Sequence, residues 1–297
     1  MRFMLLSAVA LFLVAAAGDA ASAEAQEADV QSSIAVASPT LLDPVFGDHA
    51  VLQRGRPIPI WGRAEAGTRV TVSLNTANAT ATADATGRWR IELPAQRAGG
   101  PHALVVSAGD MSQRLTDVLV GDVWLCSGQS NMEMTLRQAA NADAEIAAAD
   151  DASLRLFNIP RRSLPQAAAE PQALAAWTPT TPDSARNFSA ACYFMARDLR
   201  RNDPGVAIGL IAASWGGSII EDWLSRDALN GMEAYQPSLQ ALDAYVRSPE
   251  DGEALWQRIS MAWWRSHDPG LQSGWYRERL DETEWRPIAA EGAWETT

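Results

Sequence analysis

Apolar strand patterns alternate with helical patterns between residues 118 and 214, and this order is the strongest constraint on the fold. The strand patterns cover residues 118–126, 153–159 and 205–214, and the helical patterns cover residues 131–149 and 187–202. Strands joined by helical crossovers predict a parallel sheet. Because the carboxyl ends of parallel strands lie at one edge of a sheet, we expect the turns after the first and last of these strands to lie side by side.

A different pattern precedes this region, from residue 41 to about residue 117. Short runs alternate between apolar and polar residues and are broken by Gly, Pro and Asn; Trp89, Ile91 and Leu93, for example, alternate with charged residues. Period-two alternation is typical of half-buried strands. Residues 41–117 are therefore predicted to form a small antiparallel β-sandwich domain, and residues 118–267 an α/β domain.

Three later segments complete the expected organisation of the chain. The Pro-rich residues 159–185 are expected to form a loop, and residues 235–266 show helical spacing of Trp and Leu. From residue 268 the sequence returns to a strand-and-turn pattern. We therefore expect residues 268–297 to be the start of a β-rich segment.

The first 23 residues have the pattern of a secretory signal peptide. A basic start precedes an apolar run over residues 4–17, and small residues up to Ala23 supply a cleavage site. We expect cleavage after Ala23, a flexible mature N-terminus over residues 24–40, and a periplasmic or secreted protein. The apolar run is shorter than the roughly 20 residues that span a bilayer, so no membrane span is expected in the mature chain.

The charge of the chain argues against some classes of partner. The formal net charge is −12, and every basic residue is arginine. This acidic balance argues against nucleic acid or an anionic membrane as a partner, and the absence of lysine removes one class of nucleophile and base. With two cysteines and three histidines, no metal site or cofactor is expected. Cys126 and Cys192 either form a disulfide or are buried thiols, and the sequence leaves both open.

The segment "DVWLCSGQSNMEM" contains the residues best suited to chemistry. A strand that ends at Cys126 and a helix that starts near Asn131 leave a tight turn, which presents Ser130 at a helix N-terminus beside free backbone amides. Such amides can stabilise the oxyanion that forms when a serine attacks an ester. The tetrad from Ser130 to Glu133 is also a capping box, S-x-x-E, and taken alone it favours a cap. The G-x-S-x-G pattern is not met, because Met132 replaces its second glycine.

Longer blocks of the sequence resemble a known family. "VLVGDVWLCSGQSNMEM" and "VAIGLIAASWGGSIIEDW" are similar to two signature blocks of the sialate O-acetylesterases, which belong to the SGNH-hydrolase superfamily, and "PVFGDHAVLQRGRPIPIWGRAEAGTRVTVSLN" is similar to their N-terminal β-domain. The resemblance implies an α/β fold with a parallel-sheet, flavodoxin-like three-layer core. It makes Ser130 the nucleophile, with oxyanion-hole amides from Ser130 and the Gly216–Gly217 turn. Gln129 and Asn131 would position the substrate or the turn.

The resemblance also shows what the chain does not contain. The superfamily takes its catalytic base from a D-x-x-H motif, and none of the three histidines, His49, His102 and His267, has Asp three positions earlier. The family's third block, similar to W-Y-Q-G-E-S-N, has no counterpart. The resemblance therefore implies that the core is incomplete, that residues 268–297 begin a truncated jelly-roll-like insertion, and that the chain alone is nearly inactive. A rearranged base formed by His267 and Asp268 is the alternative.

The expected function follows from these residues. We expect a secreted serine esterase that removes acetyl groups from sialic acid or other acetylated glycans, with an acetylated sugar or polysaccharide as its partner. The alternatives are a non-catalytic glycan-binding or structural exported protein, in which some of the 12 tryptophans bind sugars, and a transferase of the same superfamily. Two arginine pairs, at positions 161–162 and 200–201, could bind a carboxylated sugar or could be solvated.

Overall fold

The computed structural model describes residues 41–165, 175–277, 283 and 285. The chain divides into two compact units, Met1–Asp222 and Trp223–Thr297, which are described separately. The expected signal peptide and flexible N-terminus lie outside the described residues, as does most of the expected β-rich segment after residue 268.

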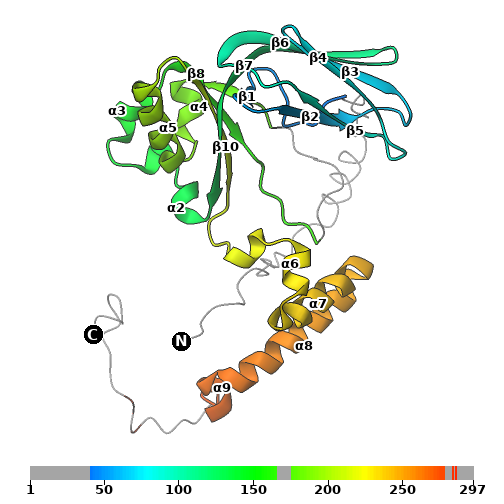
Figure 1. The fold of residues 1–297 in the computed structure, drawn as a ribbon. Helices are drawn as coiled ribbons and strands as arrows, with labels where there is room; N and C mark the ends of the chain where they lie inside the picture. Colours follow the sequence, from blue (N-terminus) through cyan, green and yellow to red (C-terminus); the bar gives the residue numbers. More distant parts are fainter. Residues whose placement is uncertain (1–40, 166–174, 278–282, 284, 286–297) are drawn as a thin grey trace, which may run out of the picture. The chain divides into compact units, whose positions relative to one another are not determined.

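The first unit is a mixed α/β structure built on a large sheet (Figure 1). Its strands are β1 (Val51–Gln53), β2 (Ile58–Arg63), β3 (Arg69–Leu74), β4 (Ala77–Thr82), β5 (Arg88–Leu93), β6 (Gly99–Ala108), β7 (Met111–Gly128), β8 (Asp151–Asn158), β9 (Thr178–Thr180) and β10 (Ala207–Ser214). The large sheet has the order β4-β3-β6-β7-β10-β8-β9, with β1 also paired to β7, while β2 and β5 form a separate pair. β7 pairs in parallel with β1 and β10, and β10 with β8; the other pairs are antiparallel.

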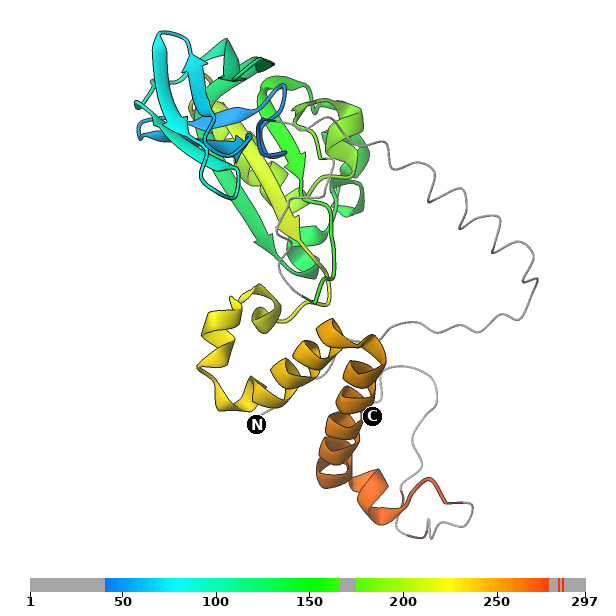
Figure 2. The same ribbon diagram turned by 90° about the vertical axis from the view of Figure 1, so that its right-hand side faces the viewer.

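Strand β7 joins the two parts of this sheet. Its first part pairs antiparallel with β6, and its last part, from Gly121 to Gly128, pairs in parallel with β10. Figure 2 shows β7 in green and β10 in yellow-green ending close together. The boundary expected after residue 117 therefore falls inside a continuous strand.

The region before this boundary has its own hydrophobic core. The β2–β5 pair packs against β3, β6 and the start of β7, and the side chains between them are buried. Trp89, Ile91 and Leu93 are among these buried side chains, and the charged residues between them are exposed, as the period-two alternation predicts.

Short helices cover one face of β7, β10 and β8 (Figure 1). They are α2 (Ser130–Glu133), η1 (Leu136–Gln138), α3 (Ala142–Ala147), α4 (Pro182–Arg186) and α5 (Ala190–Asn202), and the 3₁₀ turn η2 (Ile220–Trp223) follows β10. The core beneath α5 contains Phe188, Tyr193 and Leu210 among other buried residues. The residues that were expected to form a loop contain β9 and α4, because Thr181 caps α4 and Pro182 suits its first position.

The prediction of one helix over residues 131–149 is wrong, because three short helical segments occupy this range. Met134 is not helical, with ψ 122°, Thr135 is extended, and Asn141 is left-handed with φ 57°. The interruption has a tertiary cause: Leu136 N–H donates to Phe188 O at 2.9 Å, and Ala190 N–H donates to Met134 O at 2.8 Å. Backbone bonds to the segment before α5 replace the helical bonds that local sequence favours.

The second unit is helical in its described residues. It contains α6 (Arg226–Asn230), η3 (Glu233–Tyr235), α7 (Gln236–Arg247), α8 (Pro249–His267) and α9 (Pro269–Ser273). α7 and α8 pack so closely that only glycine fits at position 252, because a Cβ there would lie 2.3 Å from Tyr245 Cα. None of the described helices is long and apolar enough to cross a membrane.

Helix α9 lies where a β-rich segment was expected to begin. The Asp268 side chain accepts a hydrogen bond from Leu271 N–H at 2.7 Å, and Pro269 occupies the first helical position. These are strong helix-start features, which the strand-and-turn prediction did not weigh. The expected strands therefore do not begin at residue 268.

One ionic cluster predicts how the stability of the first unit depends on pH. Asp117 accepts hydrogen bonds from Arg155 Nη1 and His49 Nδ1, both at 2.7 Å, and Arg155 is buried. The hydrogen bond from Arg155, assisted by that from His49, holds the pKa of Asp117 below its ordinary value. The pKa of Asp117 is therefore lower in the folded protein than in the unfolded chain. The ionised carboxylate stabilises the fold fully at pH values above the pKa of the unfolded chain, and this stabilisation is lost as the pH falls through the pKa of the folded protein.

Replacing Asp117 by Asn is therefore expected to destabilise the protein at pH 7 and to matter progressively less as pH falls below about 4. Urea unfolding of both proteins between pH 7 and pH 3 measures the difference. Asp110→Asn is the matched control, since Asp110 is exposed between β6 and β7 and its removal changes the net charge equally. A difference between Asp117→Asn and the unsubstituted protein that stays constant across this pH range would contradict the expectation.

Candidate active site

The turns that follow β7 and β10 lie side by side, as the parallel topology predicts. Ser214 is the register partner of Gly128, and Trp215 N–H donates to Gly128 O at 2.9 Å. A Cβ on Gly216 would lie 3.5 Å from Ser130 Cα and 3.6 Å from Ser130 Cβ. The structure therefore brings the two signature blocks into van der Waals contact at the carboxyl edge of the sheet.

Ser130 is exposed at this edge and is held by the residue before it. Gln129 is the N-cap of α2, and its Oε1 accepts from Ser130 Oγ at 3.0 Å and from Ser130 N–H at 3.3 Å. Ser130 is thus the first residue of the helix and does not cap it. Since α2 has only four residues, its dipole is smaller than that of the longer helix the sequence predicted.

The capping-box interpretation of Ser130 and Glu133 is wrong. Glu133 Oε2 accepts a hydrogen bond from Gly216 N–H, and Glu133 Oε1 accepts one from Arg161 Nη1. The Glu133 carboxylate thus joins α2 to the turn after β10 and to the segment after β8. As a result, the Gly216 amide is already occupied in this structure.

Other backbone amides near Ser130 remain open. Gly217 follows with φ 83° and is exposed, and Asn131 is exposed on α2. Within the described part of the chain, neither the Asn131 nor the Gly217 N–H has an intramolecular acceptor. Together with the Ser130 N–H, which makes only a long bond to Gln129, these are candidate donors to an oxyanion.

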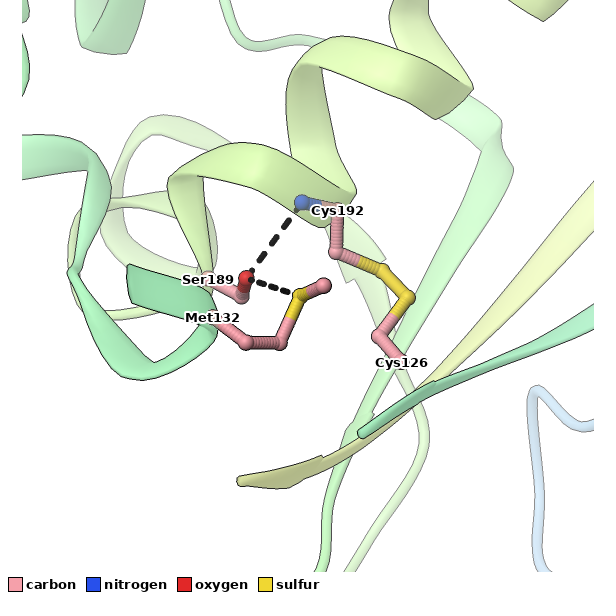
Figure 3. The surroundings of a disulfide bond; sticks show 4 residues. All are labelled: Cys126, Met132, Ser189 and Cys192. Carbon is pink, nitrogen blue, oxygen red and sulfur yellow. Dashed lines mark hydrogen bonds between the residues drawn. A yellow bond between two sulfur atoms is a disulfide. The ribbon is translucent and has the colours of Figure 1, made fainter. Parts of the chain in front are cut away.

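A disulfide fixes the end of β7. Cys126 and Cys192 are bonded, with their Cα atoms 6.1 Å apart, so the question left open by the sequence is answered by the structure. Figure 3 shows the bond between β7 and the first turn of α5, beside the Ser189 hydroxyl, which accepts from Cys192 N–H at 3.3 Å and contacts Met132 Sδ at 3.6 Å. The disulfide thus joins the strand that leads to Ser130 to helix α5.

Two histidines of the first unit lie at the far end of β7. His49 binds Asp117, and His102 lies opposite Val118. Asp117 and Gly128 are separated by about 35 Å of extended strand. Burial lowers the pKa of His102. Among the described residues of the first unit, therefore, neither histidine is within reach of Ser130 to act as its base.

In this structure His267, in the second unit, binds partners other than Asp268. Its Nδ1 lies 2.7 Å from Ser266 Oγ and 2.9 Å from Trp263 O, and its ring stacks on that of Trp263. The Asp268 carboxylate instead caps α9. This correction follows from helix capping, which competes for Asp268.

Three of the four arginines considered for carboxylate binding, Arg161, Arg200 and Arg201, have acceptors in the structure. Arg161 binds Glu133, and Arg200 binds Asp151 and the carbonyls of Pro204 and Val206. Arg200 is thus a structural residue that joins α5 to β8 and β10. Among the described residues, no group of histidine, cysteine and acidic side chains could hold a metal ion.

Comparison with known proteins identifies the family. Residues 120–258, which include both turns, match the family model for carbohydrate esterase, sialic acid-specific acetylesterase. This region of the chain belongs to the sialate O-acetylesterase family. This family consists of acetyl ester hydrolases, and the resemblance on the two blocks is confirmed.

Three similar proteins show how much of a relative this chain spans. Sialate O-acetylesterase of Rattus norvegicus is 37% identical over 190 residues, which cover 57% of this chain and 34% of that protein. That of Homo sapiens is 33% identical over 220 residues, which cover 67% of this chain and 41% of the relative. The crystal structure of a carbohydrate acetylesterase from Xanthomonas citri superposes with TM-score 0.62 at 43% identity, over 66% of this chain and 44% of that one. The chain thus spans less than half the length of these relatives.

Proposed function

We propose that this chain carries the nucleophile of a carbohydrate O-acetylesterase, with Ser130 as the attacking residue and an acetylated sialic acid or another acetylated glycan as the substrate. The observation that carries the proposal is that the exposed Ser130 lies beside the turn after β10, where a Cβ on Gly216 would lie 3.6 Å from Ser130 Cβ, and that backbone amides of both segments are open. The names of its relatives, sialate O-acetylesterase and carbohydrate acetylesterase, support the substrate class.

The proposed chemistry is acyl transfer to the serine. Ser130 Oγ attacks the acetyl carbonyl carbon, its proton passes to a base, and backbone amides stabilise the oxyanion. The carbon–oxygen bond to the sugar then breaks, the sugar oxygen takes a proton, and an acetyl-serine remains. Water then attacks this ester and gives one proton to the base; the bond to Ser130 Oγ breaks, acetate leaves, and Ser130 Oγ takes the proton from the base.

The base is the component that the first unit does not supply. The Ser130 hydroxyl donates to the Gln129 amide oxygen, which is too weakly basic to accept the proton at neutral pH. We infer that the described residues of this unit hold the nucleophile and the oxyanion donors, and that turnover needs an imidazole from elsewhere.

We further infer that β7, β10 and β8 belong to an SGNH-hydrolase-like three-layer core, preceded by a small β-sandwich that contains β2 to β6. The parallel pairing and the separate core around Trp89 support this division. We also propose a periplasmic or secreted location. The N-terminal pattern supports it, and so does the Cys126–Cys192 disulfide, because disulfides persist mainly in oxidising compartments.

Added imidazole provides the test of this function. The purified chain is incubated with 4-nitrophenyl acetate and with O-acetylated sialic acid, and acetate release is measured against protein-free controls over a range of imidazole concentrations. We expect slow protein-dependent hydrolysis that rises with imidazole, because the added base replaces the missing one. Binding of the acetylated sugar without acetate release above the controls, at every concentration, would contradict the esterase and favour a glycan-binding protein.

A further inference from the structure

The Glu133 carboxylate joins three segments around Ser130. It lies one helical turn after Ser130 on α2, and its two oxygens bind different partners, the Gly216 amide and the Arg161 guanidinium. Its side chain is 28% exposed, so both contacts are partly shielded from water. Neither contact is needed to form α2 itself.

The position of this carboxylate raises an electrostatic question. A Cβ on Gly216 would lie 2.5 Å from Glu133 Oε2 and 3.6 Å from Ser130 Cβ. The carboxylate is thus within about 6 Å of the Ser130 side chain, where its negative charge would oppose a second negative charge on the substrate oxygen. Arg161 offsets that charge, because its guanidinium binds the other carboxylate oxygen.

Gly216 itself shows what the carboxylate holds in place. Because the Gly216 N–H binds Glu133, this amide is occupied, and the next amide along the chain, that of Gly217, is the open glycine donor of the turn. A carboxylate that accepts from Gly216 therefore holds the Trp215–Gly216 peptide, which directly precedes the peptide that carries the Gly217 N–H. This separates two glycines that the sequence treated as equivalent.

We propose that Glu133 and Arg161 are a positioning pair for the acetyl-transfer site. Glu133 holds the turn after β10 through the Gly216 amide, and Arg161 compensates its charge so that an oxyanion can form beside Ser130. The role rests on the proposed function of Ser130, since it acts through the donors to that oxyanion. Neither residue is a catalytic residue, because neither exchanges a proton with the substrate.

Charge and hydrogen bonding can be separated by substitution. Arg161→Met leaves the Glu133 charge uncompensated, and is expected to slow the reaction of Ser130 with a fluorophosphonate about tenfold. Glu133→Gln keeps an acceptor for Gly216 and removes the charge, so its rate should stay within about threefold of the unsubstituted rate. The double variant should recover to the rate of Glu133→Gln. Glu133→Ala removes the acceptor and should slow the reaction by tenfold or more, toward the loss of one oxyanion donor, about 10².

The experiment measures the second-order rate of fluorophosphonate labelling of the full chain, in fixed imidazole, for all of these variants. Arg186→Met is the matched control, because Arg186 is exposed at the end of α4 and its loss should leave the rate unchanged. Arg161→Gln repeats the charge removal should Arg161→Met fail to fold, as judged by its thermal unfolding.

Three outcomes decide the proposal. Recovery of the Arg161→Met rate by adding Glu133→Gln supports charge compensation. Two results overturn the positioning role and leave the proposed function intact. In the first, the unsubstituted chain is labelled and Arg161→Met is labelled equally fast; in the second, the double variant is labelled more slowly than Arg161→Met. Absence of any labelling of the unsubstituted chain overturns the proposed function, and the positioning role with it.

Discussion

Replacing Ser130 by alanine is expected to remove all protein-dependent hydrolysis of acetyl esters and to leave only the rate of imidazole in solution. In a complete triad, loss of the serine costs about 10⁶ in turnover. In this chain the unsubstituted rate is expected to be low, because no base is in reach of Ser130 among the described residues of the first unit. The alanine variant can therefore reduce the rate by a smaller factor. The expected result is therefore loss to the protein-free rate.

The matched control is Ser127→Ala. Ser127 is likewise an exposed serine, lies three residues earlier at the end of β7, and has no part in the proposed chemistry. Its replacement should leave the hydrolysis rate within about twofold, since exposed substitutions away from a site change little. Initial rates of both variants with 4-nitrophenyl acetate and imidazole make the comparison. Hydrolysis by Ser130→Ala at more than a tenth of the unsubstituted rate would place the nucleophile elsewhere.

Removing the disulfide is expected to cause the largest loss of stability. The Cys126–Cys192 bond closes a loop with a sequence separation of 66 residues. In the chain-entropy model a loop of this length corresponds to about 4 kcal/mol of stability. The Cys126→Ala, Cys192→Ala double variant should therefore have a free energy of unfolding lower by about that amount, measured by urea denaturation.

Reduction supplies the control for this prediction. The unsubstituted protein in excess dithiothreitol should unfold at nearly the same urea concentration as the double variant, because both lack the bond and both cysteines are buried among apolar groups. A double variant within about 1 kcal/mol of the oxidised protein would show that the bond contributes little to the fold.

Local patterns predicted the strands and the neighbouring turns well. The alternation around Trp89 and Ile91 is a property of consecutive residues, so the sequence contains it directly. The approach of Ser130 to Gly216 follows from the parallel pairing of β7 with β10, which the order of strands and helices implies. Neither inference needs knowledge of a particular side-chain contact.

The errors occurred where a distant partner decides the structure. The S-x-x-E tetrad has a good local explanation as a cap, but Glu133 binds Gly216, 83 residues away. The helix predicted after residue 131 is broken by bonds to the residues before α5. Strand β7 crosses the expected domain boundary because its pairing partner changes from β6 to β10, which its own residues do not reveal.

The central claim is that the Ser130 hydroxyl is the nucleophile, and peptide mapping tests it most directly. The chain is treated with a fluorophosphonate in the presence of imidazole, digested, and sequenced by tandem mass spectrometry. We expect a single phosphonyl group on Ser130 and none on the Ser130→Ala variant. A modified residue other than Ser130, or an unmodified chain at every imidazole concentration, would contradict it.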